Sequence, residues 1–195
     1  MRPLIYVVAL PLVLVAASCQ KDKDEQPAPA APTPEFRLSN GVFYPTNNTA
    51  VGVSHPANKV QGSAAWENGR IVLRFKSSRD APEDEVRLAL PAGFTASTYP
   101  YQLTPAFAPN TVEVTYIKTF QLSITSLLSK VYKGHEQKTE GNLIITAFDE
   151  KKQLISGSYE ATFKDVSDPF AEISPPPARK SNVAVYGEFT NLSLR

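Results

Sequence analysis

The sequence predicts an all-β protein, an antiparallel β-sandwich of about eight to ten strands, with a barrel-like closure of the same strands as the alternative. Apolar and polar residues alternate with a period of two in several short runs, which is typical of half-buried strands. Turn-forming residues separate these runs. After the first nineteen residues, no apolar pattern with a 3.6-residue period reaches the length of a helix.

The first residues of the chain have the composition of a secretory signal peptide. Arg2 supplies a positive charge, residues 4–17 form an apolar run that contains Pro11, and small residues lead up to Cys19. The run is shorter than the ~20 apolar residues that a helix needs to span a membrane. We therefore expect residues 1–18 to be a signal peptide.

Cys19 is the only cysteine of the chain and follows directly after the small residues Ala16, Ala17 and Ser18. This arrangement resembles the bacterial lipobox, and the resemblance implies that Cys19 is lipidated and is the first residue of the mature protein. Two or three acyl chains, typical of such an anchor, would hold the protein stably on a lipid bilayer. The charged cluster at residues 20–25 resembles the export signal of surface lipoproteins in the Bacteroidetes. That likeness implies an outer-membrane location with surface exposure as an option.

Residues 19–35 form the expected tether between this anchor and the folded domain. Prolines and alanines alternate in residues 26–34, and such a composition favours an extended, disordered segment that rises ~3.1 Å per residue. Residues 36–195 have the length of a single domain. Without the signal peptide the chain loses Arg2 of its twenty basic residues and has nineteen of each charge, which gives no electrostatic reason to expect nucleic acid as a partner.

Strands are expected wherever the period of two is clear. The four runs with the clearest alternation are residues 70–76, 85–90, 119–125 and 155–163. Leu143, Ile144 and Ile145 are apolar on both faces and predict a central strand. Asn68-Gly69 predicts a tight hairpin turn, because both residues tolerate positive φ, and residues 149–152 predict a second turn.

The last third of the chain carries a family resemblance. Its residues are Gly141 to Thr146, Asp149, Ile155 to Tyr159, Ala161 to Phe163 and Gly187 to Leu192. Their order resembles a group of small, functionally uncharacterised lipoproteins of the Bacteroidetes that share a domain of unknown function. In this comparison, residues 60–66 correspond to a first strand that ends in tryptophan. The resemblance implies a sandwich-like fold and an envelope address, and it supplies no catalytic residue.

Catalytic and metal chemistry find little support in the sequence. His55 and His135 have none of the spacings of metal ligands and are expected to be solvated in loops. The chain lacks the Gly-x-Ser-x-Gly motif of hydrolases and the glycine-rich phosphate-binding motifs. We expect no enzyme activity, no catalytic residue, no metal and no cofactor.

Two acidic groups are candidates for calcium, because calcium accepts irregular oxygen ligation. One comprises Asp80, Glu83, Asp84 and Glu85, and the other comprises Asp165, Asp168 and Glu172. Neither has the spacing of a calcium loop, so solvated surface turns are the expectation for both. The long connection over residues 165–180, which contains three consecutive prolines, is functional or disordered by its length.

Aromatic residues are the best candidates for ligand contact. Tyr99, Tyr101 and Phe107 lie in a proline-flanked stretch and are our candidate binding residues, whereas Trp66 is expected in the core. The sequence thus predicts a membrane-anchored lipoprotein with a non-catalytic module that binds a glycan, a protein or an envelope component. A carrier for a lipid or another small apolar ligand, with a barrel-like cavity, is the alternative.

Overall fold

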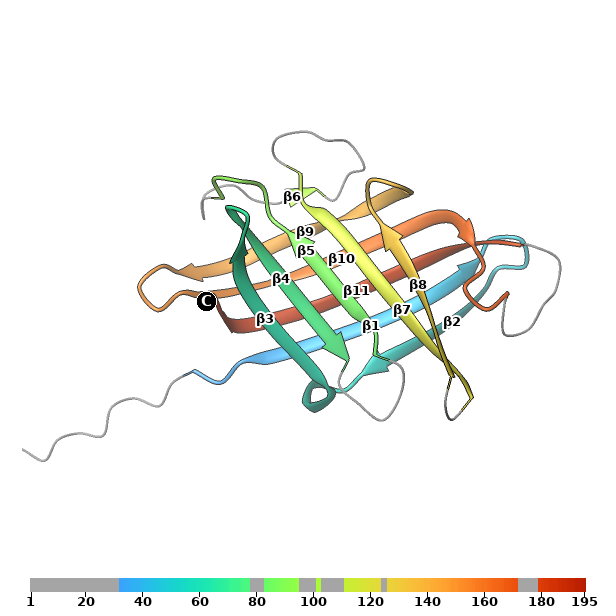
Figure 1. Ribbon diagram of the computed structural model, residues 1–195, viewed down its shortest axis with the longest axis horizontal. Helices are drawn as coiled ribbons and strands as arrows, with labels where there is room; N and C mark the ends of the chain where they lie inside the picture. The colour runs from blue at the N-terminus through green and yellow to red at the C-terminus, as the bar shows by residue number, and fades with distance from the viewer. Residues whose placement is uncertain (1–31, 78–82, 95–100, 103–110, 124–125, 172–178) are drawn as a thin grey trace, which may run out of the picture. The chain divides into compact units, whose positions relative to one another are not determined.

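The computed structural model describes residues 32–77, 83–94, 101–102, 111–123, 126–171 and 179–195, which belong to one compact unit, Pro32–Arg195. The unit is all-β and antiparallel, as predicted, and its strands form two sheets (Figure 1). Cys19, the signal peptide and most of the tether lie outside the described residues. In order along the chain the strands are β1 (Glu35–Tyr44), β2 (Thr49–His55), β3 (Val60–Glu67), β4 (Arg70–Ser77), β5 (Glu85–Ala89), β6 (Tyr101–Gln102), β7 (Glu113–Ser123), β8 (Ser126–Lys133), β9 (Lys138–Asp149), β10 (Leu154–Ser167) and β11 (Lys180–Ser193).

The two sheets pack face to face rather than closing into a barrel. Sheet A has the strand order β2-β1-β11-β10-β9-β6, and sheet B has the order β3-β4-β5-β7-β8. In Figure 1 sheet B lies in front and its strands cross those of sheet A at a marked angle. At one corner the sheets touch, where Leu194 bridges to Ala64 and the Trp66 amide donates to the Arg195 carbonyl at 3.2 Å.

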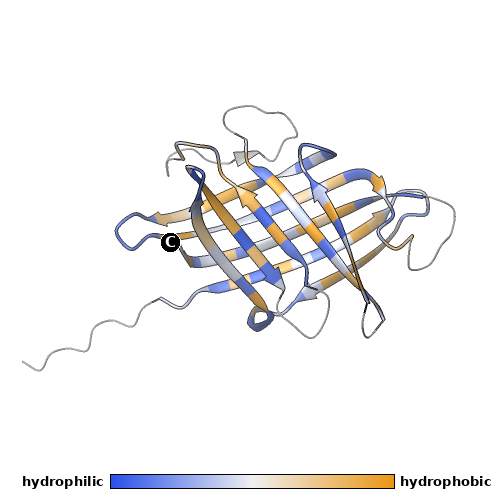
Figure 2. Ribbon diagram, viewed as in Figure 1, coloured by the Kyte–Doolittle hydropathy of each residue, from blue (hydrophilic) through white to orange (hydrophobic). Residues whose placement is uncertain are grey.

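Apolar side chains from both inner faces form the core. Figure 2 shows the resulting alternation of hydrophobic and hydrophilic bands along the strands of both sheets. Aromatic rings meet at its centre, where Phe75 of β4 lies 5.0 Å from Tyr159 of β10 and 5.2 Å from Phe189 of β11, measured between ring centroids. This interior explains the period of two in the sequence, because each strand turns every second residue toward the opposite sheet.

Both predicted turns are confirmed. Asn68 and Gly69 adopt φ of 51° and 75° and join β3 to β4, as expected for a two-residue hairpin loop. In the second turn, the Asp149 side chain accepts hydrogen bonds from the amides of Lys151 and Lys152 at 3.1 and 3.0 Å. Both hairpins therefore follow from local turn chemistry.

The strand expected at residues 119–125 is confirmed over its described part, where it is the end of β7, which begins at Glu113 and ends at Ser123. Two other predictions about strands and core residues are wrong. Strand β9 is next to the edge strand β6 rather than central, and Ile144 is 38% exposed on its outer face. Trp66 is 54% exposed instead of buried, because it stands near the end of the edge strand β3.

Two acidic residues expected to be solvated are buried instead, each only 1% exposed. Asp84 binds Lys118 of β7 at 2.8 Å and Asn40 of β1 at 2.7 Å through Oδ2, so it connects the two sheets. Asp168 binds Arg179 at 2.6 Å and thereby joins the two ends of the connection whose residues 172–178 lie outside the described part. Both carboxylates have structural partners in place of calcium.

The hydrogen-bond partners of Asp168 also lower the pKa of its carboxyl group. Burial alone would raise the pKa of this carboxyl, but hydrogen bonds from Arg179, the Phe170 amide and the Tyr44 hydroxyl outweigh burial and lower it. The Arg179 guanidinium also lies 3.8 Å from the centre of the Tyr44 ring, within the range of a cation–π contact.

Within the described residues, no helix is long and apolar enough to cross a membrane.

Candidate functional site

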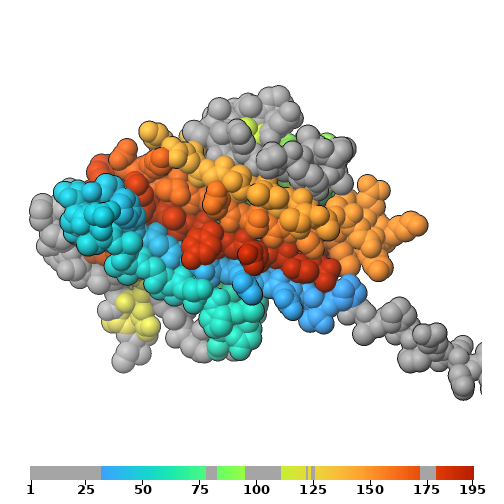
Figure 3. Space-filling model, turned by 180° about the vertical axis from the view of Figure 1, so that it is seen from behind, coloured from blue at the N-terminus to red at the C-terminus, as the bar shows by residue number. Residues whose placement is uncertain are grey.

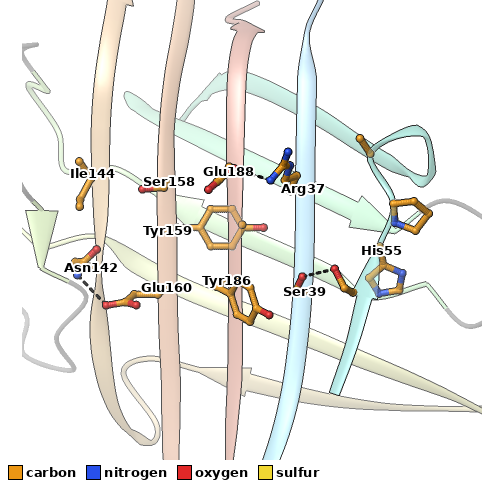
Figure 4. A pocket seen from close by; sticks show the side chains of 14 residues that line it. Arg37, Ser39, His55, Asn142, Ile144, Ser158, Tyr159, Glu160, Tyr186 and Glu188 are labelled. Carbon is orange, nitrogen blue, oxygen red and sulfur yellow. Dashed lines mark hydrogen bonds and ion pairs between the residues drawn. The ribbon is translucent and has the colours of Figure 1, made fainter. Parts of the chain in front are cut away.

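The outer face of sheet A carries a groove of about 620 Å³, within the size range of ligand sites. It extends across β9, β10, β11, β1 and β2, which are consecutive neighbours in sheet A and can be followed in the view from behind (Figure 3). We call this surface the Tyr186 face. Its lining side chains are drawn in Figure 4 and include Arg37, Ser39, Ser54, His55, Asn142, Ile144, Ser158, Glu160, Tyr186 and Glu188.

Tyr186 is the large aromatic residue of this face and is 55% exposed. In the sheet register it pairs with Ser39 of β1 on one side and with Glu160 of β10 on the other. The serine is too small to cover the ring, and the Glu160 carboxylate turns away from the ring toward Asn142 (Figure 4). The ring therefore presents apolar surface to solvent in a groove that is lined by charged and amide side chains as well as by apolar ones such as Ile144 and Pro56.

Charged and amide groups surround this ring in pairs. Asn142 Nδ2 donates to Glu160 Oε1 at 3.0 Å, and Arg37 Nη1 lies 3.5 Å from Glu188 Oε2. Arg37 and Glu188 are both largely exposed. Each pair thus presents donors and acceptors to a ligand, and each group holds its neighbour in place.

Gly187 lies between Tyr186 and Glu188 on β11, at a position where other groups leave no room for a side chain. A Cβ at this position would collide with the Arg37 carbonyl oxygen and would lie 2.5 Å from the Tyr159 hydroxyl. The absence of a side chain lets Tyr159 pack flat beneath the strand, where its hydroxyl is buried without a hydrogen-bond partner among the described residues. Burial raises the pKa of Tyr159, so this hydroxyl stays neutral.

His55 forms part of the wall of the groove at the end of β2. Its Nε2 lies 3.4 Å from Oδ2 of Asp84 and its side chain is mostly buried, which corrects the expectation of a solvated loop histidine. Next to it, Ser39 Oγ donates to Ser54 Oγ at 2.9 Å. The wall is therefore joined to the buried Asp84–Lys118 pair and does not depend on surface contacts alone.

The residues predicted from sequence to bind ligand do not make up this face. Tyr99 and Phe107 lie outside the described residues, and Tyr101 is in β6, where its backbone pairs with Leu143. Two further tyrosines, Tyr116 and Tyr132, are buried in the core with ring centroids 6.0 Å apart. No group of three or more metal-ligating side chains occurs within the described ranges.

Sequence reasoning missed Tyr186, although a signal for it exists. Val183, Val185 and Phe189 alternate with Tyr186 and Glu188 along β11. Since the valines and the phenylalanine are buried, the period of two places the tyrosine on the wet face. An aromatic residue in phase with charged residues on a long strand is the pattern that would have identified this site.

Comparisons of the chain with protein-family models, with curated proteins and with solved structures found no match.

Proposed function

We propose that this protein is a membrane-anchored lipoprotein of the cell envelope whose β-sandwich binds an oligosaccharide without chemically changing it. The observation that carries the binding role is the half-exposed ring of Tyr186 in a groove that charged and amide side chains also line. A sugar ring has one apolar face and a rim of hydroxyl groups. An exposed aromatic ring with hydrogen-bonding groups around it matches both.

The polar residues around Tyr186 support the same ligand class. Arg37 and Asn142 donate hydrogen bonds, whereas the carboxylates of Glu160 and Glu188 accept them. Sugar hydroxyl groups both donate and accept. A ligand that lay along the Tyr186 face would satisfy these groups on both sides of the ring.

A binding role also fits the setting of the two carboxylates better than glycoside hydrolysis does. A hydrolase needs one carboxylic acid that an apolar, enclosed pocket keeps protonated. Here Glu188 is largely exposed beside Arg37, and Glu160 accepts a hydrogen bond from Asn142 on an open sheet face. The anchor, for its part, is supported by Cys19 and the residues before it.

A glycan array probed with the purified domain, residues 32–195, tests the binding role, and Tyr186→Ala is the key variant. Truncating an aromatic anchor costs about 2 kcal/mol or more, roughly a thirtyfold loss of affinity. Tyr186→Phe keeps the ring and should retain most of the affinity. Trp66→Ala is the matched control, because Trp66 is 54% exposed and lies on β3, away from the groove.

Binding that survives Tyr186→Ala unchanged would place the ligand elsewhere and contradict the proposal. The same holds if Trp66→Ala weakens binding as much as Tyr186→Ala does. Capture of a protein and of no glycan would instead favour a protein ligand for this face.

A further inference from the structure

We infer that the ligand of the Tyr186 face is an acidic oligosaccharide, one that carries sulfate or carboxylate groups on part of its length. This inference rests on the proposed function and adds the chemical class of the ligand. It is carried by a second groove of about 570 Å³, lined by four lysines from four different strands. They are Lys130 of β8, Lys138 of β9, Lys164 of β10 and Lys180 of β11.

Three of these lysines lie on the same face of sheet A as Tyr186. Residues four apart in a strand point to the same side, so Lys164 shares the face of Glu160. Lys138 pairs with Lys164 in the register and belongs to that face as well. Lys180 precedes Tyr186 by six residues in the regular strand β11, which places it on this face too.

The lysine groove has a positive charge balance, whereas the domain as a whole is close to neutral. Against its four lysines stand two carboxylates, Glu136 and Asp165. Glu136 is bound by Lys133 Nζ at 2.7 Å, and this hydrogen bond lowers its pKa, so its charge is already compensated. On the same face of sheet A, Glu140 forms an ion pair with Lys164. Lys138 and Lys180 are therefore the best candidates to attract an anion.

Charge also sets the direction in which such a ligand would lie. The groove around Tyr186 contains Glu160 and Glu188 against Arg37, so an anionic sugar is disfavoured there and a neutral ring is accepted. At ~3.4 Å per residue, the strand advances ~14 Å from Glu160 to Lys164 and ~20 Å from Tyr186 to Lys180. A short oligosaccharide can thus place a neutral unit on Tyr186 and an acidic unit at Lys138 and Lys180.

The test uses an array in which each oligosaccharide is present in a neutral and a sulfated form. Lys138→Gln/Lys180→Gln is the test variant, and Lys151→Gln/Lys152→Gln is the matched control. The control removes the same charge from exposed lysines in the turn between β9 and β10. We expect the unmodified domain to bind sulfated forms at least tenfold more tightly than neutral ones at low salt. Added salt should weaken this preference.

The test variant should lose the preference for sulfated forms while its affinity for the neutral forms stays unchanged, which also shows that it is folded. The control variant should behave like the unmodified domain. Equal loss in both variants, or a preference that persists in the test variant, would overturn the inference. Binding of neutral forms alone would overturn it too and leave the proposed function standing. Failure of every form to bind would overturn both.

Discussion

Tyr159 and Tyr44 place the same hydroxyl group in two different buried environments. The Tyr159 hydroxyl has no hydrogen-bond partner among the described residues, whereas the Tyr44 hydroxyl donates to Asp168 Oδ1 at 3.0 Å. A buried hydroxyl without a partner is unfavourable, and one bound to a carboxylate is favourable. The two tyrosines should therefore respond in opposite ways to loss of the hydroxyl.

Tyr159→Phe is expected to leave the free energy of unfolding unchanged or to raise it by up to about 1 kcal/mol, because it removes an unpaired polar group. Tyr44→Phe is expected to lower it by about 1.5–3 kcal/mol, since a hydrogen bond to a charged group is lost. Urea unfolding of both variants measures these changes. A clear destabilisation by Tyr159→Phe would mean that its hydroxyl is hydrogen-bonded in solution.

Single residues were the hardest features to predict from the sequence. Asp84 and Asp168 occur in loop-like, acidic stretches, and nothing local reveals that Lys118 and Arg179 meet them in the fold. Trp66 has an apolar side chain at an inward position, yet no strand lies beyond β3 to cover it. Burial of a given side chain depends on which strands become neighbours, and that information is not local.

The buried pair of Asp84 and Lys118 acts at the scale of the two sheets. Asp84 leads into β5 and Lys118 belongs to β7, both of sheet B, while Asn40 of β1 in sheet A binds both of them. Removing one member of a buried ion pair leaves an uncompensated charge in the interior. Loss of either Asp84 or Lys118 should thus weaken the contact between the two sheets.

Lys118→Met is expected to lower the free energy of unfolding by about 3–5 kcal/mol, the range found when a buried ion pair loses one partner. The matched control is Lys76→Met, which breaks the more exposed ion pair with Glu85 at 3.1 Å. That change should cost no more than about 1 kcal/mol. Thermal and urea unfolding measure both, and similar losses in the two variants would contradict a special role for the buried pair.

The link between Asp168 and Arg179 predicts a pH dependence for the connection that it joins. The pKa of Asp168 in the folded protein lies below its ordinary value of 3.8. Because folding lowers the pKa of this carboxyl, its ionised form stabilises the folded protein at higher pH. That stability is lost as the pH falls through 3.8 toward the folded-state pKa. Asp168→Asn should therefore reduce the loss of stability below that pH. Unfolding curves from pH 5 downward measure this, and parallel acid profiles for both proteins would contradict it.

At the scale of elements, the sequence was informative where a pattern is local. The alternation at residues 70–76 and 155–163 predicted β4 and part of β10, and Asn68-Gly69 predicted the two-residue turn between β3 and β4. The alternation at residues 119–125 predicted the second half of β7, which ends at Ser123. The Tyr186 face was missed, since it is composed of single residues from five strands.

At the scale of the whole molecule, the sequence makes one prediction about the fold of the domain and a separate one about membrane attachment. The fold could be predicted as an antiparallel sandwich because its period and turns are repeated along the chain, and ten strands of five or more residues agree with the expected number. The order of the strands could not be predicted, because pairing between distant strands leaves no local pattern. Membrane attachment through Cys19 stays a prediction.

Cys19→Ser tests this attachment in a bacterium that has an outer membrane. The unmodified protein should fractionate with membranes and yield an N-terminal peptide whose mass includes acyl chains, whereas the variant should be released in a folded form. Acyl chains contribute ~0.8 kcal/mol of membrane binding per buried methylene. Their loss should therefore move nearly all of the protein from the membrane fraction to the soluble fraction. Membrane association that persists in Cys19→Ser would show that another segment holds it.

The pairing of β1 with β11 has a consequence for how the chain reaches its fold. Glu35 pairs with Thr190, so the first and last of the strands are neighbours inside sheet A. Until β11 is present, both β1 and β10 expose edges that can pair with other chains. Such distant pairing also makes folding slow. Slow folding would give such a chain time to cross a membrane unfolded, if it is exported as proposed, and the chain would need protection from aggregation until its last strand has emerged.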